Sequence, residues 1–148
     1  MWFSKKQNTK VPEGQITTKR LGDAAESIAL GYLVRAGLKP VEANYRTPGR
    51  GGGEIDLIMR APDGTLVFVE VRQRSGQSHG GAGASISAVK QKRIIFAARH
   101  YLTHFKSLPP CRFDVVLVQG GVGDGKADQT ENGGDASIEW LRGAFDAS

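Results

Sequence analysis

Apolar residues recur at steps of three and four from residue 21 to residue 36, which is typical of an amphipathic helix. Thr17 or Thr18 can cap the start of this helix, and Gly37 follows its last turn, where glycine commonly ends a helix. Glu26 lies in the middle of the helix beside apolar neighbours. The recurring positions are Leu21, Ala24, Ala25, Ile28, Tyr32, Leu33 and Ala36.

The next segments have the pattern of strands. Residues 41–46 form a short apolar and polar alternation, and two stronger apolar runs follow at 54–60 and 65–74. The two runs are separated by Ala-Pro-Asp-Gly, in which Pro62 suits the first central position of a type I turn. Gly64 suits the left-handed residue that closes a three-residue hairpin loop. The sequence therefore predicts a β-hairpin over residues 54–74.

The turn also predicts which residues of the hairpin face one another. The predicted pairs are Ala61 with Thr65, Arg60 with Leu66, Asp56 with Glu70 and Glu54 with Arg72. Directly opposed residues share a face of the sheet, with β-carbons about 5 Å apart. We therefore expect a polar face that carries Glu54, Asp56, Glu70 and Arg72. The opposite face is expected to be core and holds Ile55, Leu57, Met59, Val67, Val69 and Val71.

The second half of the chain contains another helix and two further elements. A glycine-rich loop at 75–84 leads to Ser87, which caps a helix predicted to end near Phe105. Residues 112–118 form a strand, 119–136 a mobile Gly/Asp-rich loop, and 137–145 a final short strand or helical turn. This order predicts an α/β fold in which helices flank a mixed sheet.

Length and charge limit the domain organisation and the partners. We expect a flexible basic leader at 1–16 and a single domain over 17–146. The net charge of +5 favours a polyanionic partner such as nucleic acid. The lone Cys111 excludes an internal disulfide and is expected to be a half-buried, unreactive thiol. No apolar run is long enough to span a membrane and no secretory signal is present, so a cytoplasmic location with no membrane partner is expected.

The predicted polar face of the hairpin has the composition of a metal site. Asp56 and Glu70 would repel one another as neighbouring anions, and a divalent cation between them would remove the conflict. Carboxylate and water oxygens suit Mg²⁺. Glu26 would add a third carboxylate if the first helix packs beside the hairpin, and Arg72 would stabilise charge on a phosphate. The plainer interpretation, a solvated strand face with a Glu54–Arg72 ion pair, stays open.

Over residues 17–146 the sequence resembles the YraN-like family of uncharacterised bacterial proteins, which belongs to the PD-(D/E)XK nuclease-like superfamily. The matching stretches are Gly22–Glu26, Tyr32-Leu33, Asn44–Arg46, Gly53–Ile58, Val67–Arg72, Ser87 through Lys90 to Ala98, Tyr101-Leu102, Arg112–Val116 and Ala144-Phe145. The resemblance implies a restriction-endonuclease-like, three-layer α/β/α fold similar to that of archaeal Holliday-junction resolvases.

The same resemblance implies roles for the hairpin residues. Asp56 and Glu70 would hold Mg²⁺ or Mn²⁺, and Glu26 would assist from the helix. A lysine two residues after the glutamate usually orients or activates the attacking water, but this chain has Arg72 there. Arginine stays protonated and cannot act as a base, although it can still polarise a phosphate.

Basic side chains near the hairpin are candidates for binding the nucleic-acid backbone. These are Arg46, Arg74, Lys90, Lys92 and Arg93. The last three lie in the first turns of the second helix, where the helix dipole disfavours cations, so a functional reason is worth considering; a solvated helix face is the alternative.

Three further features of the sequence carry weaker signals. His79 in the glycine-rich loop is expected to be exposed without a role. His100 and His104 have a metal-like spacing but lack a third ligand. The run at 49–53 lacks the Lys-Ser/Thr ending of a nucleotide loop and precedes a strand, so it is not interpreted as a nucleotide site.

These observations leave three functional hypotheses. The first is a Mg²⁺-dependent endonuclease-like protein that hydrolyses structured or branched DNA. The second is a non-catalytic nucleic-acid-binding module that kept the fold after losing the lysine. The third is an adaptor that binds another protein through the same face. A resolvase-like activity would favour a homodimer.

Overall fold

The computed structural model describes residues 18–74, 86–119 and 137–147, apart from the side chains of residues 18–23 and 74. The predicted leader at 1–16 and nearly all of the predicted loops lie outside these residues. Gln119, which the sequence assigns to a loop, instead closes a strand.

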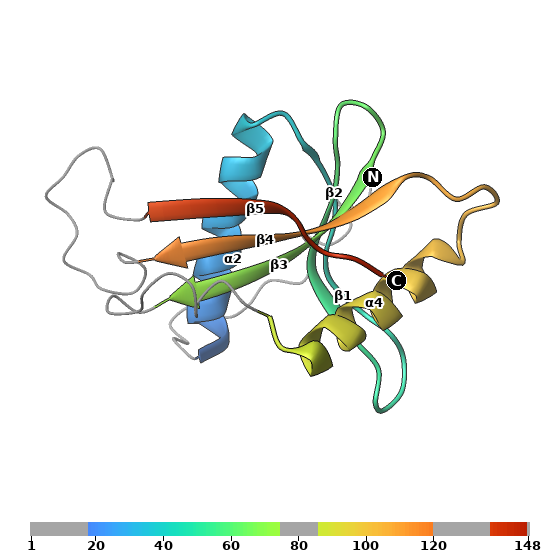
Figure 1. Ribbon diagram of the computed structural model, residues 1–148. Helices are drawn as coiled ribbons and strands as arrows, with labels where there is room; N and C mark the ends of the chain where they lie inside the picture. The colour runs from blue at the N-terminus through green and yellow to red at the C-terminus, as the bar shows by residue number, and fades with distance from the viewer. Residues whose placement is uncertain (1–17, 75–85, 120–136, 148) are drawn as a thin grey trace, which may run out of the picture.

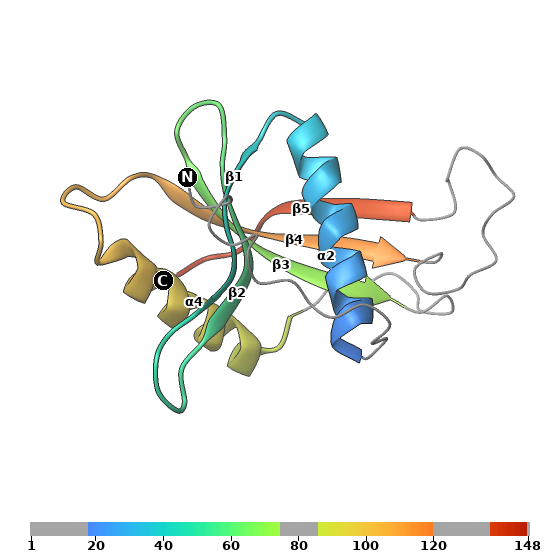
Figure 2. The same ribbon diagram turned by 180° about the vertical axis from the view of Figure 1, so that it is seen from behind.

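Within the described residues, five strands form one mixed sheet with a helix on each face. The elements are α2 (Thr18–Arg35), β1 (Lys39–Arg46), β2 (Glu54–Arg60), β3 (Leu66–Arg74), α4 (Ala88–Leu102), β4 (Cys111–Gln119) and β5 (Ser137–Phe145). The strand order is β1-β2-β3-β4-β5, and only the β3–β4 pair is parallel. Figures 1 and 2, seen from opposite sides, show α2 in front of the sheet in one view and α4 in front in the other. The predicted three-layer, restriction-endonuclease-like α/β/α fold is confirmed.

Alternate residues of β3 enter two different cores, as the period of two in a strand requires. Val67 and Val69 pack with α2, whereas Leu66 and Phe68 pack with α4. The helices contribute Ala25, Ala29 and Leu33 from α2 and Ile94, Ala97 and Ala98 from α4. Because both faces are covered, the hairpin has no solvated face in its paired part, contrary to the expectation of one polar face.

The hairpin turn forms as the sequence predicts. Ala61 N–H donates to the Thr65 carbonyl at 2.9 Å, and Gly64 has a φ of 94°. The side chain of Asp63 accepts the Thr65 N–H at 3.0 Å, which closes the loop. Arg60 pairs with Leu66 in the predicted register.

The regular pairing of β2 with β3 stops where the polar residues begin. The paired segment runs from Arg60–Leu66 to Leu57–Val69, so the predicted pairing of Glu54 with Arg72 lies beyond it. Asn44 on β1 lies across from Asp56 and has a φ of 55°, which breaks the alternation of side chains here. Ile55 accordingly packs with the α4 cluster, and its predicted place beside Leu57 and Met59 is wrong.

The two helices begin and end close to the predicted residues. The chain leaves α2 through Gly37, whose φ is 107°, and Leu38 N–H returns to the Leu33 carbonyl at 3.0 Å. Ser87 caps α4 by accepting the Lys90 N–H at 3.1 Å. The helix ends at Leu102, shorter than the predicted end near Phe105.

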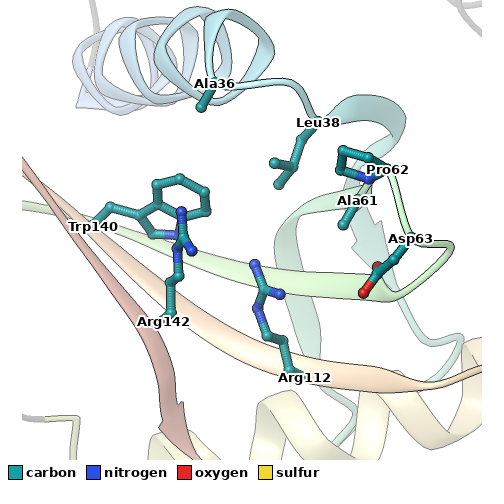
Figure 3. A pocket seen from close by; sticks show the side chains of 8 residues that line it. All are labelled: Ala36, Leu38, Ala61, Pro62, Asp63, Arg112, Trp140 and Arg142. Atoms are coloured by element: carbon teal, nitrogen blue, oxygen red, sulfur yellow. The ribbon is translucent and has the colours of Figure 1, made fainter.

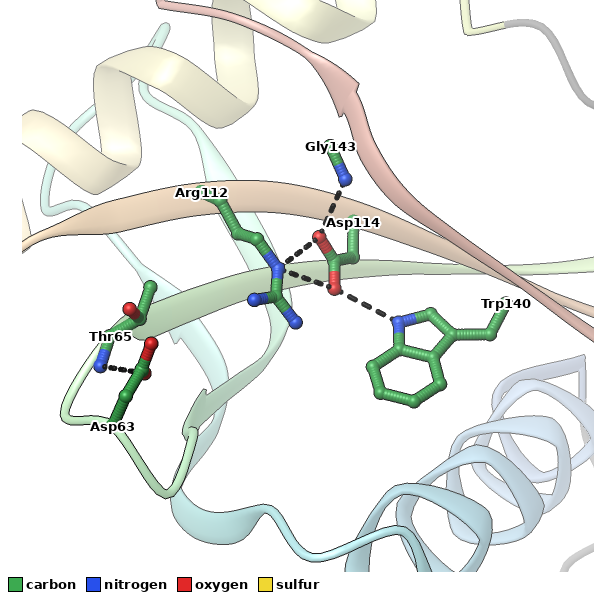
Figure 4. Close-up of polar contacts among 6 residues, drawn as sticks. All are labelled: Asp63, Thr65, Arg112, Asp114, Trp140 and Gly143. Carbon is green, nitrogen blue, oxygen red and sulfur yellow. Dashed lines mark hydrogen bonds and ion pairs between the residues drawn. The ribbon is translucent and has the colours of Figure 1, made fainter.

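A fully buried aspartate ties β4 to β5 (Figure 4). Asp114 accepts hydrogen bonds from Arg112 Nε at 3.0 Å, Trp140 Nε1 at 2.9 Å and Gly143 N at 3.0 Å. The Gly143 bond falls where the β4–β5 register shifts, and Gly143 has a φ of 60°. The carboxylate therefore satisfies donors at a point where the regular strand pairing is interrupted.

We expect Asp114→Asn to lower the free energy of unfolding by about 2–4 kcal/mol, because the amide loses the charge and turns a donor toward groups that are themselves donors. Urea denaturation of the purified variant measures this loss. Asp146→Asn, an exposed position after β5, is the control and should shift stability by less than about 0.5 kcal/mol. Equal stabilities of the two variants would contradict a structural role for Asp114.

Candidate functional site

Asp56 and Glu70 meet where β2 separates from β3. Asp56 Oδ2 accepts the Val71 N–H at 2.8 Å, so a side chain replaces the strand carbonyl that regular pairing would supply. Glu70 is only 7% exposed, and its carboxyl group is hydrogen-bonded to that of Asp56. The pairing of these two side chains, which the hairpin turn predicted, is therefore present in the structure.

Lys90 of α4 faces the same pair of carboxyl groups. Its Nζ lies 3.4 Å from Glu70 Oε2, and its side chain is 37% exposed. Lys90 reaches Glu70 because α4 connects β3 to the parallel strand β4 and its first turn lies at the end of β3 that carries Glu70. This contact gives a reason for the cation in the first turn of the helix, where the dipole disfavours positive charge.

Burial and mutual repulsion change the acidity of both carboxyl groups. Burial and then the negative charge of Asp56 raise the pKa of Glu70 to about 8, against the smaller opposing effect of Lys90. Burial also raises the pKa of Asp56, while the Val71 N–H and Lys90 oppose that rise. Without a further cation, the pair is therefore expected to hold one proton, carried by Glu70 and donated to Asp56.

The donor set of this pair suits a small divalent cation. Magnesium binds through one or two carboxylates and keeps several waters, and a positive ion would let both groups ionise. Among residues 18–74, 86–119 and 137–147, no group of three or more His, Cys, Asp or Glu side chains could hold a metal ion. Two carboxylates completed by water thus fit Mg²⁺ better than a metal that needs a full set of protein ligands.

Two other predicted site residues are half-buried on the elements that the sequence assigned to them. Glu26 is half-buried on α2, and Arg72 is half-buried on β3, two residues beyond Glu70. Their predicted roles, together with those of Asp56 and Glu70 as metal ligands, stay predictions. The side chain of Arg74 lies outside the described residues.

Two of the predicted basic residues lie beside the glycine-rich turn between β1 and β2. Arg46 pairs with Glu54 at 3.3 Å, so the open alternative of a Glu54–Arg72 pair has a competitor on β1. Arg46 and Arg93 line a common pocket with the glycine-rich turn between β1 and β2. Lys92 is exposed on α4. The sequence had grouped Lys90 with these residues as a backbone contact; its position beside Glu70 was not predicted.

The histidines and the cysteine make local contacts. His100 Nδ1 lies 2.6 Å from the Tyr45 hydroxyl, and His104 Nδ1 lies 2.9 Å from the Tyr101 carbonyl. Cys111 is exposed, so the prediction of a half-buried thiol is wrong, although partial covering of the sulfur raises its pKa and keeps it protonated. His79 lies outside the described residues.

A second pocket opens at the opposite end of the hairpin (Figure 3). It has a volume of about 330 Å³ and includes Arg112 and Arg142 together with Asp63 and the edge of Trp140. Arg142 lies over the Trp140 ring at 4.0 Å, and Arg112 is bound to the buried Asp114. Because the two aspartates balance the two arginines, this pocket lacks the excess positive charge of a polyanion site.

The model of the uncharacterised protein family UPF0102 matches residues 25–118. The chain belongs to this family. Membership in UPF0102 confirms the family resemblance seen in the sequence. The matched range contains Glu26, Asp56, Glu70 and Lys90 and ends before β5.

Individual UPF0102 relatives match along the full chain. A UPF0102 protein of Polaromonas sp. strain JS666 is 69% identical over 155 residues, covering 100% of both chains. The UPF0102 protein of Polaromonas naphthalenivorans strain CJ2 is 67% identical with the same coverage, and that of Acidovorax sp. strain JS42 is 52% identical over 99% of this chain and 98% of its own. In the part of this UPF0102 chain that the structure describes, neither helix is long and apolar enough to cross a membrane.

The raised pKa of Glu70 predicts a pH-dependent stability. The folded state binds the Glu70 proton more tightly than the unfolded chain does, so stability falls as pH rises from about 4.5 to about 8. The Glu70→Gln side chain does not ionise, so this variant avoids the loss of stability with rising pH. We therefore expect the variant to gain stability relative to the wild type between pH 5 and pH 8, by an amount on the order of a few kcal/mol.

Urea denaturation in EDTA at both pH values measures this gain. Asp63→Asn serves as the control: hydrogen bonds from Thr65 lower the pKa of Asp63, so its difference from the wild type should be the same at pH 5 and at pH 8. If the Glu70→Gln difference also stays constant with pH, Glu70 ionises like an exposed glutamate and the shared proton is absent.

Proposed function

We propose that this protein is a Mg²⁺-dependent endonuclease-like phosphodiesterase that acts on nucleic acid, with structured or branched DNA as the substrate class. The observation that supports this proposal best is the hydrogen-bonded Asp56–Glu70 pair, in which Glu70 is buried and faced by Lys90. The restriction-endonuclease-like fold and the net charge of +5 support the same function.

Asp56 and Glu70 would hold the Mg²⁺ ion, because a divalent cation between them would let both carboxyl groups ionise. When bound, Mg²⁺ would act as a Lewis acid toward the phosphodiester. The Val71 N–H keeps Asp56 in one orientation, so this ligand is held in place before the ion arrives. Glu26, from α2, is proposed to assist through water.

Lys90 and Arg72 are the cations proposed to stabilise charge that develops on the phosphate. Lys90 already lies at the carboxyl pair, 3.4 Å from Glu70. Arg72 follows Glu70 by two residues and, by the period of two in a strand, starts from the same face. Its permanent charge suits electrostatic stabilisation and excludes a role as a base.

One observation favours a second function, a nucleic-acid-binding module without turnover. The position two residues after Glu70 carries arginine, where the resemblance leads us to expect lysine. A protein that kept its acidic pair and basic surroundings but lacked a group to activate water would bind DNA and leave it intact.

A cleavage assay separates the two functions. We expect the wild-type protein to cut four-way-junction or linear DNA with Mg²⁺ or Mn²⁺, and Asp56→Asn to lose the cleavage while still binding the DNA. Salt-sensitive binding without cleavage under either metal supports the binding module. Absence of both binding and cleavage, on DNA and on RNA, would refute the proposed function.

We expect Lys90→Met to lower the rate of cleavage by about 10²-fold, because a cation that faces the reacting phosphate contributes on that scale. Lys90→Arg should retain more of the rate, since it keeps the charge. Lys106→Met, at an exposed position just after α4, is the control and should leave turnover at saturating substrate unchanged.

Calorimetric titration with Mg²⁺ provides a second readout that does not depend on cleavage. Lys90→Met removes a positive charge next to the ligands and should therefore tighten Mg²⁺ binding, whereas Lys106→Met should alter it less. Equal rates and equal Mg²⁺ affinities for the two methionine variants would show that Lys90 plays no part in the site.

A further inference from the structure

The pocket between the β1–β2 turn and α4 has the charge and size of a site for one phosphate group. It has a volume of about 200 Å³, below the roughly 300–1,000 Å³ of pockets that enclose drug-sized ligands. Its lining includes Arg46, Arg93 and Glu54 along with the glycines of the turn. Two guanidinium groups against one carboxylate leave a net positive charge.

The glycine-rich turn is folded tightly around this pocket. Gly49 and Gly51 have φ values of 88° and 68°, which other residues rarely adopt. A side chain at Gly52 would clash with Thr47, and one at Gly53 would clash with the backbone carbonyl of Arg93. The glycines therefore let the turn approach α4 so closely that Arg93 becomes part of the same pocket.

Thr47 fixes the base of the turn from within. It is buried, its N–H donates to the Gly53 carbonyl at 3.1 Å, and its Oγ1 accepts the Gly53 N–H at 2.9 Å. The turn is thus closed by its own hydrogen bonds. Arg46 engages Glu54 through Nε at 3.3 Å, and its guanidinium has four more N–H donors on the terminal nitrogens.

The pocket adjoins the carboxyl pair along two elements. Glu54 precedes Asp56 by two residues on β2, a separation of about 7 Å along a strand. Arg93 follows Lys90 by three residues on α4, which places the two side chains next to each other on the helix surface. Neighbouring phosphates on one strand are separated by a distance of this order, because the backbone winds around the helix axis while rising about 3.4 Å per nucleotide. A strand with one phosphate at Lys90 would therefore bring a second one to the pocket.

We propose that this pocket binds a backbone phosphate of the nucleic-acid strand that lies at the Asp56–Glu70 pair, through Arg93 and Arg46. The proposal rests on the proposed function, since it assigns the pocket to the same substrate. The ligand chemistry is a phosphate group with one or two negative charges. A polynucleotide and a free mononucleotide both carry that chemistry, and the test below separates them.

The salt dependence of DNA binding tests the pocket without requiring cleavage. A fluorescent four-way junction and a single-stranded thymidine oligomer are titrated in EDTA from 50 to 200 mM salt. Each neutralised phosphate adds about 0.9 to the slope of log affinity against log salt on duplex DNA and about 0.7 on a single strand. We expect Arg93→Gln to reduce the slope by about that amount, and Arg46→Gln to reduce it in the same direction.

Arg99→Gln is the matched control, because Arg99 is also exposed on α4 but lies outside the pocket. Its slope should equal that of the wild type. Thermal unfolding of all three variants checks that the fold is kept; the close contact of Gly53 involves the backbone of Arg93, which Arg93→Gln retains. A slope for Arg93→Gln equal to that of Arg99→Gln would overturn the pocket.

The outcomes distinguish this proposal from the proposed function. If Arg93→Gln and Arg99→Gln bind with equal salt slopes, the phosphate site is wrong and the proposed function is unaffected. A reduced slope for Arg93→Gln together with no cleavage in Mg²⁺ supports the phosphate site and refutes the nuclease activity. Failure of the wild type to bind any nucleic acid removes both. If thymidine monophosphate binds in an Arg93-dependent manner while neither polymer does, the ligand is a free nucleotide and the polymer assignment is wrong.

Discussion

Two carboxyl groups in hydrogen-bonding contact inside a protein repel one another when both ionise, so one of them tends to keep a proton. Asp56 and Glu70 are in this position, and the neighbouring structure is arranged around it. The pairing of β2 with β3 stops so that Asp56 can accept the Val71 N–H. Lys90 faces Glu70 from the other side. Each of these features lowers the free energy needed to ionise both carboxyl groups, yet the pKa of Glu70 stays raised to about 8. The remaining cost is what a bound divalent cation would remove.

The layered fold explains why Glu70 is buried at all. Both faces of the hairpin are covered, with Val67 and Val69 under α2 and Phe68 under α4. A parallel pair such as β3–β4 needs a long crossover, and α4 supplies it. The start of this crossover helix brings Lys90 Nζ to within 3.4 Å of Glu70, which is itself only 7% exposed. The topology that completes the sheet therefore also assembles the candidate site.

The sequence predicted the features that depend on local residues. The Pro-Asp-Gly turn set the register of the hairpin, and this register was enough to bring Asp56 opposite Glu70. Ser87 marked the start of α4. The fold class followed from the order of the elements and agreed with the family resemblance.

The features that the sequence did not predict depend on contacts between distant segments. Lys90 and Glu70 are brought together only by the path of α4, and the turn at residues 49–53 forms a pocket only because α4 lies against Gly53. Strict alternation along β2 also failed to predict that Ile55 packs on the α4 side of the sheet. The irregularity coincides with the positive φ of Asn44 on the neighbouring strand. The periodicity of apolar residues describes one helix or strand at a time, and it carries no information on contacts between elements.

The position of the cation bears on whether the site can turn over a substrate. Because residue 72 is arginine, the strand that carries Glu70 has no lysine that could accept a proton. Considered alone, this strand favours the binding module. The structure places an ammonium group at Glu70 from another element. Electrostatic stabilisation depends on where a charge lies in space and not on which strand or helix supplies it. The substitution at Arg72 therefore removes one candidate for activating water while leaving the positive charge of the site in place.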